Sequence, residues 1–336
     1  MAIILHTIFK ITKDYKSKLQ INPKQIDACN ISCTNLLFLI MIIILSSCAQ
    51  RNLVEPSFMI NSKFFYNETD YIGYGTHGSG PRDVIFLHGF AASADTWTPL
   101  LPYIEGKQTT FHFLDLKGHG RSNYSRNTDF SLYAYADIVQ HYIEEKQIRR
   151  PTIVGHSFGG TIALLYTIKN TQPHLSTYPS ELFLMAAPAY KFPLPILVRF
   201  FSSSLLYNLG NLFLPLNTQV AIALKEAYSD ESKIRDEITN TYVYHLRQRS
   251  VQIALRRTAE QIDFDAYARY MAMLPSIEAK VTIIWGEEDA IVQPRYGRQL
   301  HKDLPNSNII LIPACGHNMH EECPEEIASA LKSAGF

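Results

Sequence analysis

The sequence predicts an α/β fold, namely a doubly wound, mostly parallel sheet with an inserted helical segment. Short, nearly continuous apolar runs alternate along the chain with segments of helical periodicity. Such runs are typical of parallel strands that are buried on both faces. A helix-rich stretch from about residue 188 to 275 interrupts this alternation. The chain has 336 residues, 46% of them hydrophobic, which is enough for one large α/β domain or two smaller ones.

The expected elements follow one another in chain order. Buried strands are expected at residues 84–87, 111–114, 152–154, 182–185, 281–285 and 309–312. Helices that flank the sheet are expected at residues 132–143 and 161–168. Helices of the insertion are expected at residues 196–213, 221–226, 234–259 and 265–274. We therefore expect a core domain built from residues 61–187 and 276–336, and a helical cap at 188–275.

The first 47 residues have the features of a targeting segment. Residues 1–35 contain five lysines and two aspartates. Residues 36–45 are ten apolar residues without a break, and no charged residue occurs from 28 to 50. Ten residues are too few to span a hydrocarbon core of ~30 Å comfortably, but they suit the apolar region of a secretory signal. Residues 48–60 are expected to form a linker.

The apolar run ends in Leu45-Ser46-Ser47-Cys48, which resembles the lipobox of bacterial lipoproteins. This resemblance implies that Cys48 is lipidated and becomes the first residue of an exported, membrane-anchored protein. An uncleaved N-terminal anchor and ordinary cleavage after Ala49 stay open as alternatives. The stretch before the apolar run is long for a signal peptide, so either translation starts further along or the basic region is extended.

Charge and cysteine content bear on the expected partners and cofactors. Lysine plus arginine and aspartate plus glutamate both number 31, which argues against a nucleic-acid partner. Beyond the targeting segment and Cys48, the remaining cysteines are Cys315 and Cys323, which could form a disulfide in an exported protein. Together with His317 and His320 they look superficially like a zinc cluster, but the spacing is not that of a usual zinc site. We therefore predict no metal and no organic cofactor.

The stretch Gly155-His156-Ser157-Phe158-Gly159 fits the pattern G-x-S-x-G, between an expected strand and an expected helix. This context predicts a nucleophile elbow, a tight turn that raises a serine hydroxyl above the sheet. Gly155 and Gly159 would lack side chains where the strand and helix backbones pass closely. The alternative interpretation is a glycine-rich turn that only packs.

A serine nucleophile needs a base, and the base needs an orienting carboxylate. Asp289 follows the strand expected to end at residue 285, and His317 follows the strand expected to end at residue 312. Both therefore lie at the sheet edge where open α/β sheets build their sites. The chain order Ser157, Asp289, His317 predicts a catalytic triad.

Residues from about 60 to 336 resemble an α/β-hydrolase with a cap domain. The motifs that carry the resemblance are "FLHGFAASADTW", "DLKGHGRS", "VGHSFGG", "WGEEDAIVQP" and "GHNMHEECPEE". The resemblance implies a serine hydrolase of the carboxylesterase or lipase kind, with Asp289 as the acid and Glu288 as second choice. It implies His317 as the base, because His317 directly follows Gly316, with His320 as second choice.

The same resemblance implies an oxyanion hole formed by the backbone N–H groups of Phe90 and Phe158. It implies loop-shaping rather than catalytic roles for His88, Asp115 and His119, and His156 is expected to line the pocket. A serine at position 157 excludes the epoxide hydrolases and haloalkane dehalogenases of this fold, which use aspartate there. No P-loop motif is present, so phosphoryl transfer of that kind is not supported.

The expected cap is rich in Leu, Phe and Tyr, for example "FPLPILVRFFSSSLLYNLGNLFLPL". An apolar cap favours an apolar acyl group, so an ester of a lipid, such as a monoacylglycerol, is the expected substrate class. Cleavage of a thioester, amide or C–C bond, perhydrolysis, a catalytically silent binding module and a structural lipoprotein stay open. Four cap arginines could bind an anionic group or simply be solvated, namely Arg247, Arg249, Arg256 and Arg257.

Overall fold

The computed structural model describes residues 60–336, except for 105–107, 171, 194–195 and 204–213. The targeting segment at 1–47, Cys48 and nearly all of the linker at 48–60 therefore lie outside the described residues. Within the described ranges, none of the helices is both long enough and apolar enough to cross a membrane.

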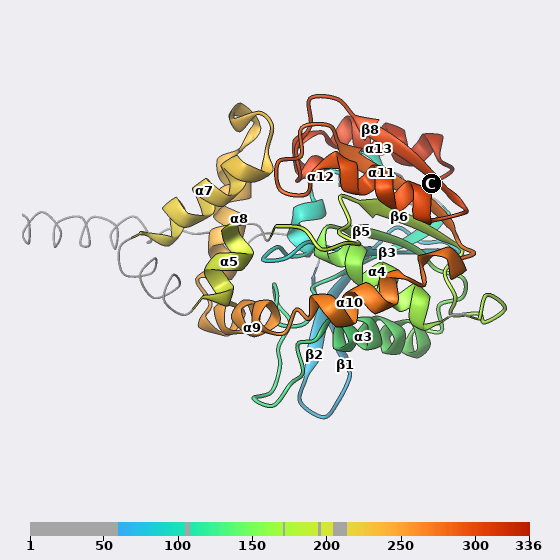
Figure 1. The fold of residues 1–336 in the computed structure, drawn as a ribbon. Helices are drawn as coiled ribbons and strands as arrows, with labels where there is room; N and C mark the ends of the chain where they lie inside the picture. The colour runs from blue at the N-terminus through green and yellow to red at the C-terminus, as the bar shows by residue number, and fades with distance from the viewer. Residues whose placement is uncertain (1–59, 105–107, 171, 194–195, 204–213) are drawn as a thin grey trace, which may run out of the picture. The chain divides into compact units, whose positions relative to one another are not determined.

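An eight-stranded sheet forms the centre of the fold, in the order β1-β2-β4-β3-β5-β6-β7-β8 (Figure 1). The strands are β1 Ser62–Phe65, β2 Tyr71–His77, β3 Arg82–Leu87, β4 Thr109–Leu114, β5 Thr152–His156, β6 Glu181–Met185, β7 Lys280–Gly286 and β8 Ser307–Ile312. The pairs β1–β2 and β2–β4 are antiparallel, and every other pair is parallel. The predicted fold class, a mostly parallel α/β sheet, is therefore confirmed.

All six expected strands are present, and each begins and ends within two residues of its expected bounds. Strands β1 and β2 were not expected from the sequence. In β2 the buried positions Ile72, Gly73 and Gly75 are interrupted by partly exposed tyrosines, so this strand has no continuous apolar run. An edge hairpin of this kind gives a much weaker pattern than a parallel strand that is buried on both faces.

Helices flank both sides of the sheet. They are α3 Leu132–Glu145, α4 Phe158–Lys169, α11 Pro294–Asp303, α12 Met319–Glu322 and α13 Pro324–Ser333, with short 3-10 turns η1 Ala94–Trp97 and η2 Leu101–Tyr103. In Figure 1, α3 and α4 lie on one side of the sheet and α13 lies on the other. Almost the whole surface of α4 is buried, as expected of a helix with apolar residues all round.

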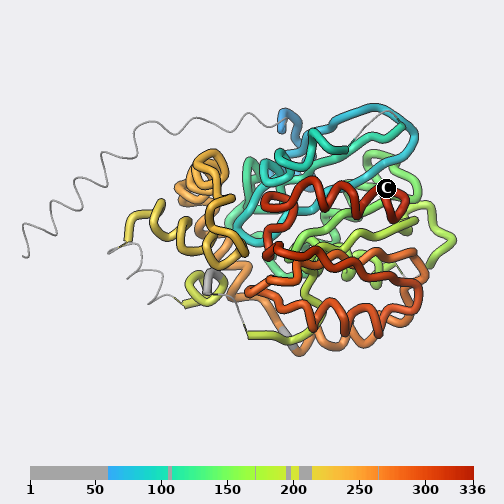
Figure 2. Tube along the Cα trace, turned by 90° about the horizontal axis from the view of Figure 1, so that it is seen from above, coloured from blue at the N-terminus to red at the C-terminus, as the bar shows by residue number. Residues whose placement is uncertain are grey.

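The segment between β6 and β7 contains helices and no strand among its described residues. Its elements are α5 Ile196–Ser202, α7 Leu216–Ala227, η3 Glu231–Lys233, α8 Asp236–Leu246, α9 Arg249–Glu260, α10 Phe264–Met271 and η4 Leu274–Ser276. Figures 1 and 2 both show α5, α7, α8 and α9 gathered beside one end of the sheet. Hereafter this segment is called the helical insertion.

The single helix expected at 234–259 is wrong, because α8 ends at Leu246 and α9 begins at Arg249. The apolar spacing explains the break. Leu246 and Val251 are both buried, yet five residues separate them, so they would lie on different faces of one continuous helix. Breaking the helix at residues 247–248 allows both to face the interior.

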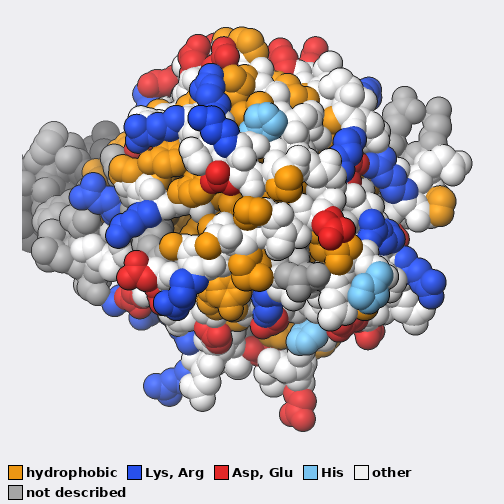
Figure 3. All heavy atoms as spheres, turned by 45° about the vertical axis from the view of Figure 1, so that its right-hand side comes forward, with side chains coloured by type: hydrophobic (Ala, Val, Ile, Leu, Met, Phe, Trp, Pro, Cys, Tyr) orange, Lys and Arg blue, Asp and Glu red, His pale blue; other side chains and the backbone are white. Residues whose placement is uncertain are grey.

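The surface drawn in Figure 3 carries lysine and arginine side chains interspersed with acidic ones. This face therefore presents no extended area of a single charge. The large hydrophobic side chains that are exposed among the described residues are scattered along the chain, at Phe65, Leu175, Leu214, Ile222, Ile253 and Met273. Single exposed apolar residues are usual on a globular surface.

Candidate active site

Ser157 lies in the tight turn between β5 and α4, with backbone angles φ 49° and ψ −115°. A positive φ is costly for a residue other than glycine and is concentrated at functional sites. The Ser157 N–H donates to the Met185 carbonyl at 2.8 Å, which fixes the turn against the end of β6. The geometry is that of the elbow that the G-x-S-x-G pattern predicts.

The glycines around Ser157 leave no room for a side chain. A Cβ atom at Gly159 would lie 2.2 Å from the carbonyl oxygen of Leu87 in β3. A Cβ atom at Gly155 would lie 2.6 Å from the Cα atom of Gly160. In both cases the obstacle is backbone, which cannot move aside without shifting the strand or the helix. The turn therefore requires glycine at both positions for steric reasons.

The structure brings Ser157, His317 and Asp289 together in one hydrogen-bonded series. Ser157 Oγ lies 3.0 Å from His317 Nε2, and His317 Nδ1 lies 2.8 Å from Asp289 Oδ2. An ionised carboxylate can only accept, so His317 Nδ1 carries a proton and donates it. In the neutral ring Nε2 is then an acceptor, and the Ser157 hydroxyl donates to it.

Backbone groups hold the Asp289 carboxylate in place. Its Oδ1 atom accepts from the N–H groups of Ile291 at 2.9 Å and Val292 at 2.8 Å, which leaves Oδ2 for His317. Asp289 is buried, whereas its neighbour Glu288 is exposed to solvent. Of the two carboxylates considered from the sequence, Asp289 is therefore the one that meets the histidine.

His317 lies in the segment between β8 and α13, residues 313–323, hereafter the His317 loop. The His317 N–H donates to the carbonyl of Ala227 at 2.7 Å, and Ala227 is the last residue of α7 in the helical insertion. The ring of His156 donates from Nε2 to the His317 carbonyl at 3.0 Å. Burial and neighbouring histidines lower the pKa of His156, so that its ring stays neutral. His156 therefore supports the His317 backbone, in addition to lining the cavity described below.

His320, the second histidine considered from the sequence, is not part of the hydrogen-bonded series of Ser157, His317 and Asp289. It is buried, and its ring packs against Trp97 and His156 with both centroid distances at 4.4 Å. Neither ring nitrogen has a hydrogen-bond partner among the described residues. Burial, and then the neighbouring His317, lower the pKa of His320 to about 3. Its ring is therefore neutral at physiological pH.

The backbone amides of Phe90 and Phe158 are the expected oxyanion donors. Both residues line the same cavity as Ser157. Phe158 is the first residue of α4, where a helix leaves its N–H groups without intrahelical acceptors. Among the described residues, neither amide has a hydrogen-bond acceptor. Both N–H groups are therefore free to bind a ligand atom in the cavity.

Ser157 opens into an apolar cavity of about 170 Å³. The helical insertion contributes the apolar side chains of Val198, Phe201, Val220, Leu224 and Leu246 to the wall. The core contributes Phe90, Phe158 and Ile291, together with Ser157 and His317. None of the lining residues described is a lysine or arginine, and Glu226 is the one acidic residue among them.

The loops behind the cavity are fastened by the residues that were expected to shape them. His88 Nε2 accepts from the N–H of Leu116 at 2.9 Å, which ties the loop after β3 to the loop after β4. Asp115 accepts from the N–H groups of Ala94 at 2.7 Å and Arg121 at 2.8 Å. The ring of His119 is within 3.0 Å of the Lys117 carbonyl. All these contacts lie within or between loops.

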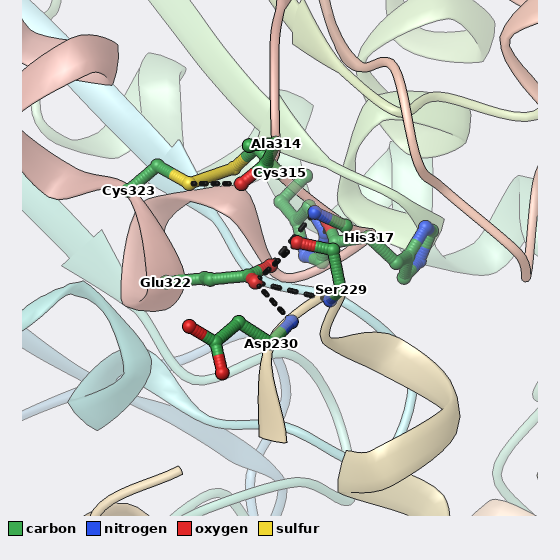
Figure 4. The surroundings of a disulfide bond; sticks show 9 residues. Ser229, Asp230, Ala314, Cys315, His317, Glu322 and Cys323 are labelled. Carbon is green, nitrogen blue, oxygen red and sulfur yellow. Dashed lines mark hydrogen bonds between the residues drawn. A yellow bond between two sulfur atoms is a disulfide. The ribbon is translucent and has the colours of Figure 1, made fainter. Parts of the chain in front are cut away.

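Cys315 and Cys323 form a disulfide (Figure 4). Within the described ranges, the one grouping with metal-ligand proximity consists of these two cysteines and Glu322. Neither His317 nor His320 belongs to it, so the four residues of the apparent zinc pattern do not converge. Since the two sulfur atoms are bonded to each other, they do not act as thiolate ligands in this structure.

The four cap arginines do not reach the cavity in the described structure. Arg256 pairs with Glu260 one helical turn away, and Arg257 donates to the carbonyls of Arg126 and Thr128. Arg247 lies over the ring of Tyr244. Arg249 is exposed on the first turn of α9. Arg247 and Arg249 are exposed as the solvated interpretation expects, whereas Arg256 and Arg257 are half-buried and Arg257 is held by structural contacts.

A family model described as alpha/beta hydrolase fold matches residues 84–324. The chain belongs to the alpha/beta hydrolase family. A curated relative, the uncharacterized hydrolase YugF of Bacillus subtilis, is 28% identical over 254 residues, which cover 75% of this chain and 89% of that protein. The range matched by the family model runs from β3 to the beginning of α13 and includes the helical insertion.

Solved structures of other alpha/beta hydrolases share the fold. An alpha/beta hydrolase fold protein from Burkholderia ambifaria superposes with a TM-score of 0.71 at 24% identity, covering 82% of this chain and 98% of that one. An esterase from Exiguobacterium antarcticum superposes with a TM-score of 0.64 at 18% identity, covering 79% of this chain and 95% of that one. At these identities the likeness establishes the fold.

Some residues that bear on the site of this alpha/beta hydrolase were missed from the sequence. Ala227 binds the His317 backbone through its carbonyl, which no sequence pattern reports. Glu322 binds the N–H of Gly316 at 2.7 Å, next to His317. In the sequence, Glu322 was noticed only as part of the motif "GHNMHEECPEE". Its position five residues after His317 was the available signal, but its partners become visible only in the folded chain.

Proposed function

We propose that this alpha/beta hydrolase cleaves carboxylic esters that carry an apolar acyl group, through an acyl-enzyme on Ser157. One observation carries the proposal. The Ser157 hydroxyl is hydrogen-bonded to His317, and His317 to Asp289, at the wall of an apolar cavity. This series of contacts supports a nucleophile, a base and an orienting carboxylate in those three roles.

In the first step, Ser157 Oγ attacks the ester carbonyl while His317 Nε2 accepts the hydroxyl proton. Asp289 stabilises the resulting imidazolium through the hydrogen bond at Nδ1. The negative charge on the former carbonyl oxygen is bound by the N–H groups of Phe90 and Phe158. Removing one such donor typically costs about 2.7–4 kcal/mol of transition-state stabilisation. The C–O bond then breaks, and the alkoxide takes the proton from His317 Nε2.

In the second step, water attacks the acyl-enzyme. His317 Nε2 accepts a proton from the water, and the oxyanion forms again at the same two amides. Collapse of the intermediate releases the carboxylic acid, and the Ser157 oxygen regains its proton from His317. The side chains described above suffice for both steps.

The wall of the cavity supports a neutral, apolar acyl group. Phenylalanine, valine and leucine side chains are prominent among the residues that line it, and burying them against an acyl chain yields about 25 cal/mol per Å². Because the described wall has no lysine or arginine, a carboxylate on the substrate would find no cationic partner there. Esters of fatty acids, including monoacylglycerol-like lipids, fit this surface better than polyanionic substrates do.

The first test is covalent labelling of the purified protein with a fluorophosphonate. We expect the wild type to be labelled and Ser157→Ala to remain unlabelled. Hydrolysis of p-nitrophenyl esters from two to twelve carbons would then give the acyl preference, with medium or long chains favoured over acetate. A protein that is folded but not labelled would support the binding-module alternative. Labelling without ester turnover would direct the search to thioesters, amides, C–C bonds or perhydrolysis.

We further propose export and membrane anchoring through a lipid on Cys48, on the strength of the sequence pattern alone. Replacement of Cys48 by alanine should abolish incorporation of labelled palmitate and release the enzyme from the membrane fraction. An uncleaved N-terminal anchor predicts instead that the variant stays membrane-bound and that neither protein takes up the label. A structural lipoprotein predicts palmitate incorporation without fluorophosphonate labelling.

A further inference from the structure

The His317 loop is closed into a ring by a covalent bond. Cys315 lies two residues before His317 and Cys323 lies six residues after it, and the disulfide joins them (Figure 4). Both cysteines are buried, with at most 3% of their surface exposed. The bond therefore fixes the two ends of the segment that presents the histidine ring to Ser157.

The carboxylate of Glu322 joins the disulfide-closed His317 loop to the helical insertion. Its Oε2 atom accepts from the N–H of Gly316 at 2.7 Å. Its Oε1 atom accepts from the Ser229 hydroxyl at 2.7 Å, from the Ser229 N–H at 3.0 Å and from the Asp230 N–H at 2.9 Å. Figure 4 shows the carboxylate between these two segments. Glu322 is only 5% exposed, so these contacts replace the water that the buried carboxylate has lost.

Further backbone hydrogen bonds, next to those of Glu322, also join the His317 loop to the turn after α7. The Ala227 carbonyl, two residues before Ser229, accepts from the N–H groups of His317 at 2.7 Å and Asn318 at 3.2 Å. Gly316 also lacks room for a side chain, since a Cβ atom there would lie 2.6 Å from the Ala227 oxygen. The turn after α7 and the His317 loop are therefore packed backbone against backbone.

We propose that the Cys315–Cys323 disulfide and the Glu322 carboxylate act together as a clamp that positions His317 for proton transfer. This inference rests on the proposed function. Glu322 is a positioning residue, since it acts through Gly316 and does not touch Ser157 or the cavity wall. Proton relays tolerate little displacement, and a misplacement of about 1 Å can lower a rate by about 10²-fold. The helical insertion thus takes part in the chemistry by holding the base, besides lining the cavity.

The chemistry of the contacts makes Glu322→Gln a sharp probe. A glutamine has the same size but only one acceptor oxygen, and its NH₂ group would face N–H donors on one side. The variant must therefore give up either the Gly316 side or the Ser229 and Asp230 side. Glu326→Gln is the matched control, because Glu326 is exposed on α13 and makes the same change of charge at the surface.

The experiment compares kcat, KM and the rate of fluorophosphonate labelling for the wild type and three variants. The variants are Glu322→Gln, Cys315→Ser/Cys323→Ser and the combination of both, with Glu326→Gln as control. We expect each separate change to lower kcat and the labelling rate about tenfold, with KM within twofold of the wild type. The combined variant should lose more than the product of the separate losses, because each brace supports the loop when the other is absent. Glu326→Gln should match the wild type.

Thermal melting of each variant accompanies the kinetics, and kcat is measured well below the lowest melting temperature. A folded Glu322→Gln with kcat and labelling rate within twofold of the wild type would overturn the proposal. So would a variant in which KM rises and kcat stays unchanged, since that pattern reports lost substrate binding. If the cysteine variant does not fold, Glu322→Gln alone decides. Failure of the wild type to react with the fluorophosphonate would instead refute the proposed function.

Discussion

The two sides of the candidate active site are built by different means. On the side of the proposed nucleophile, Ser157 is held by close backbone packing around its own turn, where Gly155 lies against α4 and Gly159 against β3, and by one hydrogen bond from its N–H to Met185. On the base side, His317 is held by groups far away in sequence, including Ala227 and His156. The proposed nucleophile is positioned mainly by close backbone packing around its turn, whereas the proposed base is positioned by hydrogen bonds from distant segments and by a disulfide.

This difference teaches where the helical insertion matters. The turn that carries Ser157 depends on close backbone packing within the sheet and α4, so it is in place once the sheet and this helix have assembled. A loop that depends on distant partners is correct only when those partners are in place. We therefore expect substitutions on the nucleophile side to affect folding and activity together. Substitutions on the base side should separate activity from stability.

The largest expected effect is on the base side, from Asp289→Asn. The N–H groups of Ile291 and Val292 require an acceptor, so the asparagine oxygen should stay with them and its NH₂ group should face His317 Nδ1. The ring would then carry its proton on Nε2 and could no longer accept the Ser157 proton. We expect kcat for a p-nitrophenyl ester to fall by about 10⁴-fold with little change in melting temperature. A loss smaller than tenfold would contradict this role.

The matching substitution on the nucleophile side is Gly159→Ala. The new Cβ atom would collide with the Leu87 carbonyl of β3 at 2.2 Å, so strand and helix must separate. We expect a loss of at least about 3 kcal/mol in the free energy of unfolding, measured in urea, together with lost activity. If the variant is as stable as the wild type, the elbow is not held by close packing and the contrast between the two sides fails.

The two sides meet at the rings of His156 and His320. The third prediction concerns how the protonation of His320 makes stability depend on pH. The pKa of His320 falls from 6.5 to about 3 on folding, so below pH 6.5 the unfolded chain binds a proton that the folded chain does not. The free energy of unfolding therefore carries no penalty from His320 above pH 6.5. Below that pH it falls by about 1.4 kcal/mol per pH unit.

Replacement of His320 by phenylalanine should remove this penalty, because phenylalanine does not bind a proton. The replacement should be tolerated, because the His320 ring has no hydrogen bond to lose among the described residues. We expect His320→Phe to gain about 2 kcal/mol relative to the wild type between pH 6.5 and 5, measured by urea unfolding. His141→Phe, at an exposed position, is the control. A constant difference between variant and wild type across this range would show that His320 is not buried as a neutral ring.

The smallest expected effect concerns the wall that the insertion contributes. Val220 on α7 lines the cavity and is 4% exposed, whereas Ile222 on the same helix is 48% exposed. Val220→Trp should fill part of the cavity and shift the preference toward short acyl chains by several-fold, about 1 kcal/mol in relative kcat/KM. Ile222→Trp should leave the preference unchanged. Equal effects of the two substitutions would place the acyl chain outside this cavity.

The fold, and the meeting of Ser157, Asp289 and His317 at one edge of the sheet, could be predicted because their signals are local. Buried parallel strands give short apolar runs, and Ser157, Asp289 and His317 each follow the end of one such run. The edge hairpin of β1 and β2 was missed because its burial alternates with exposure. The break between α8 and α9 was missed because a helical pattern by itself does not report a change of face.

The sequence by itself determined which segments form the buried parallel strands, and that Ser157, Asp289 and His317 each follow one of them. It could do so because glycine spacing and apolar runs are properties of single segments. The sequence favoured Asp289 over Glu288, but only the tertiary structure showed why Asp289 meets His317, since the two carboxylates are neighbours and only Asp289 is buried. It also brought the carbonyl of Ala227 to the N–H of His317, and the N–H of Ser229 to the carboxylate of Glu322, across 90 or more residues of chain. Contacts between distant segments depend on how the elements pack, and no pattern within one segment encodes them.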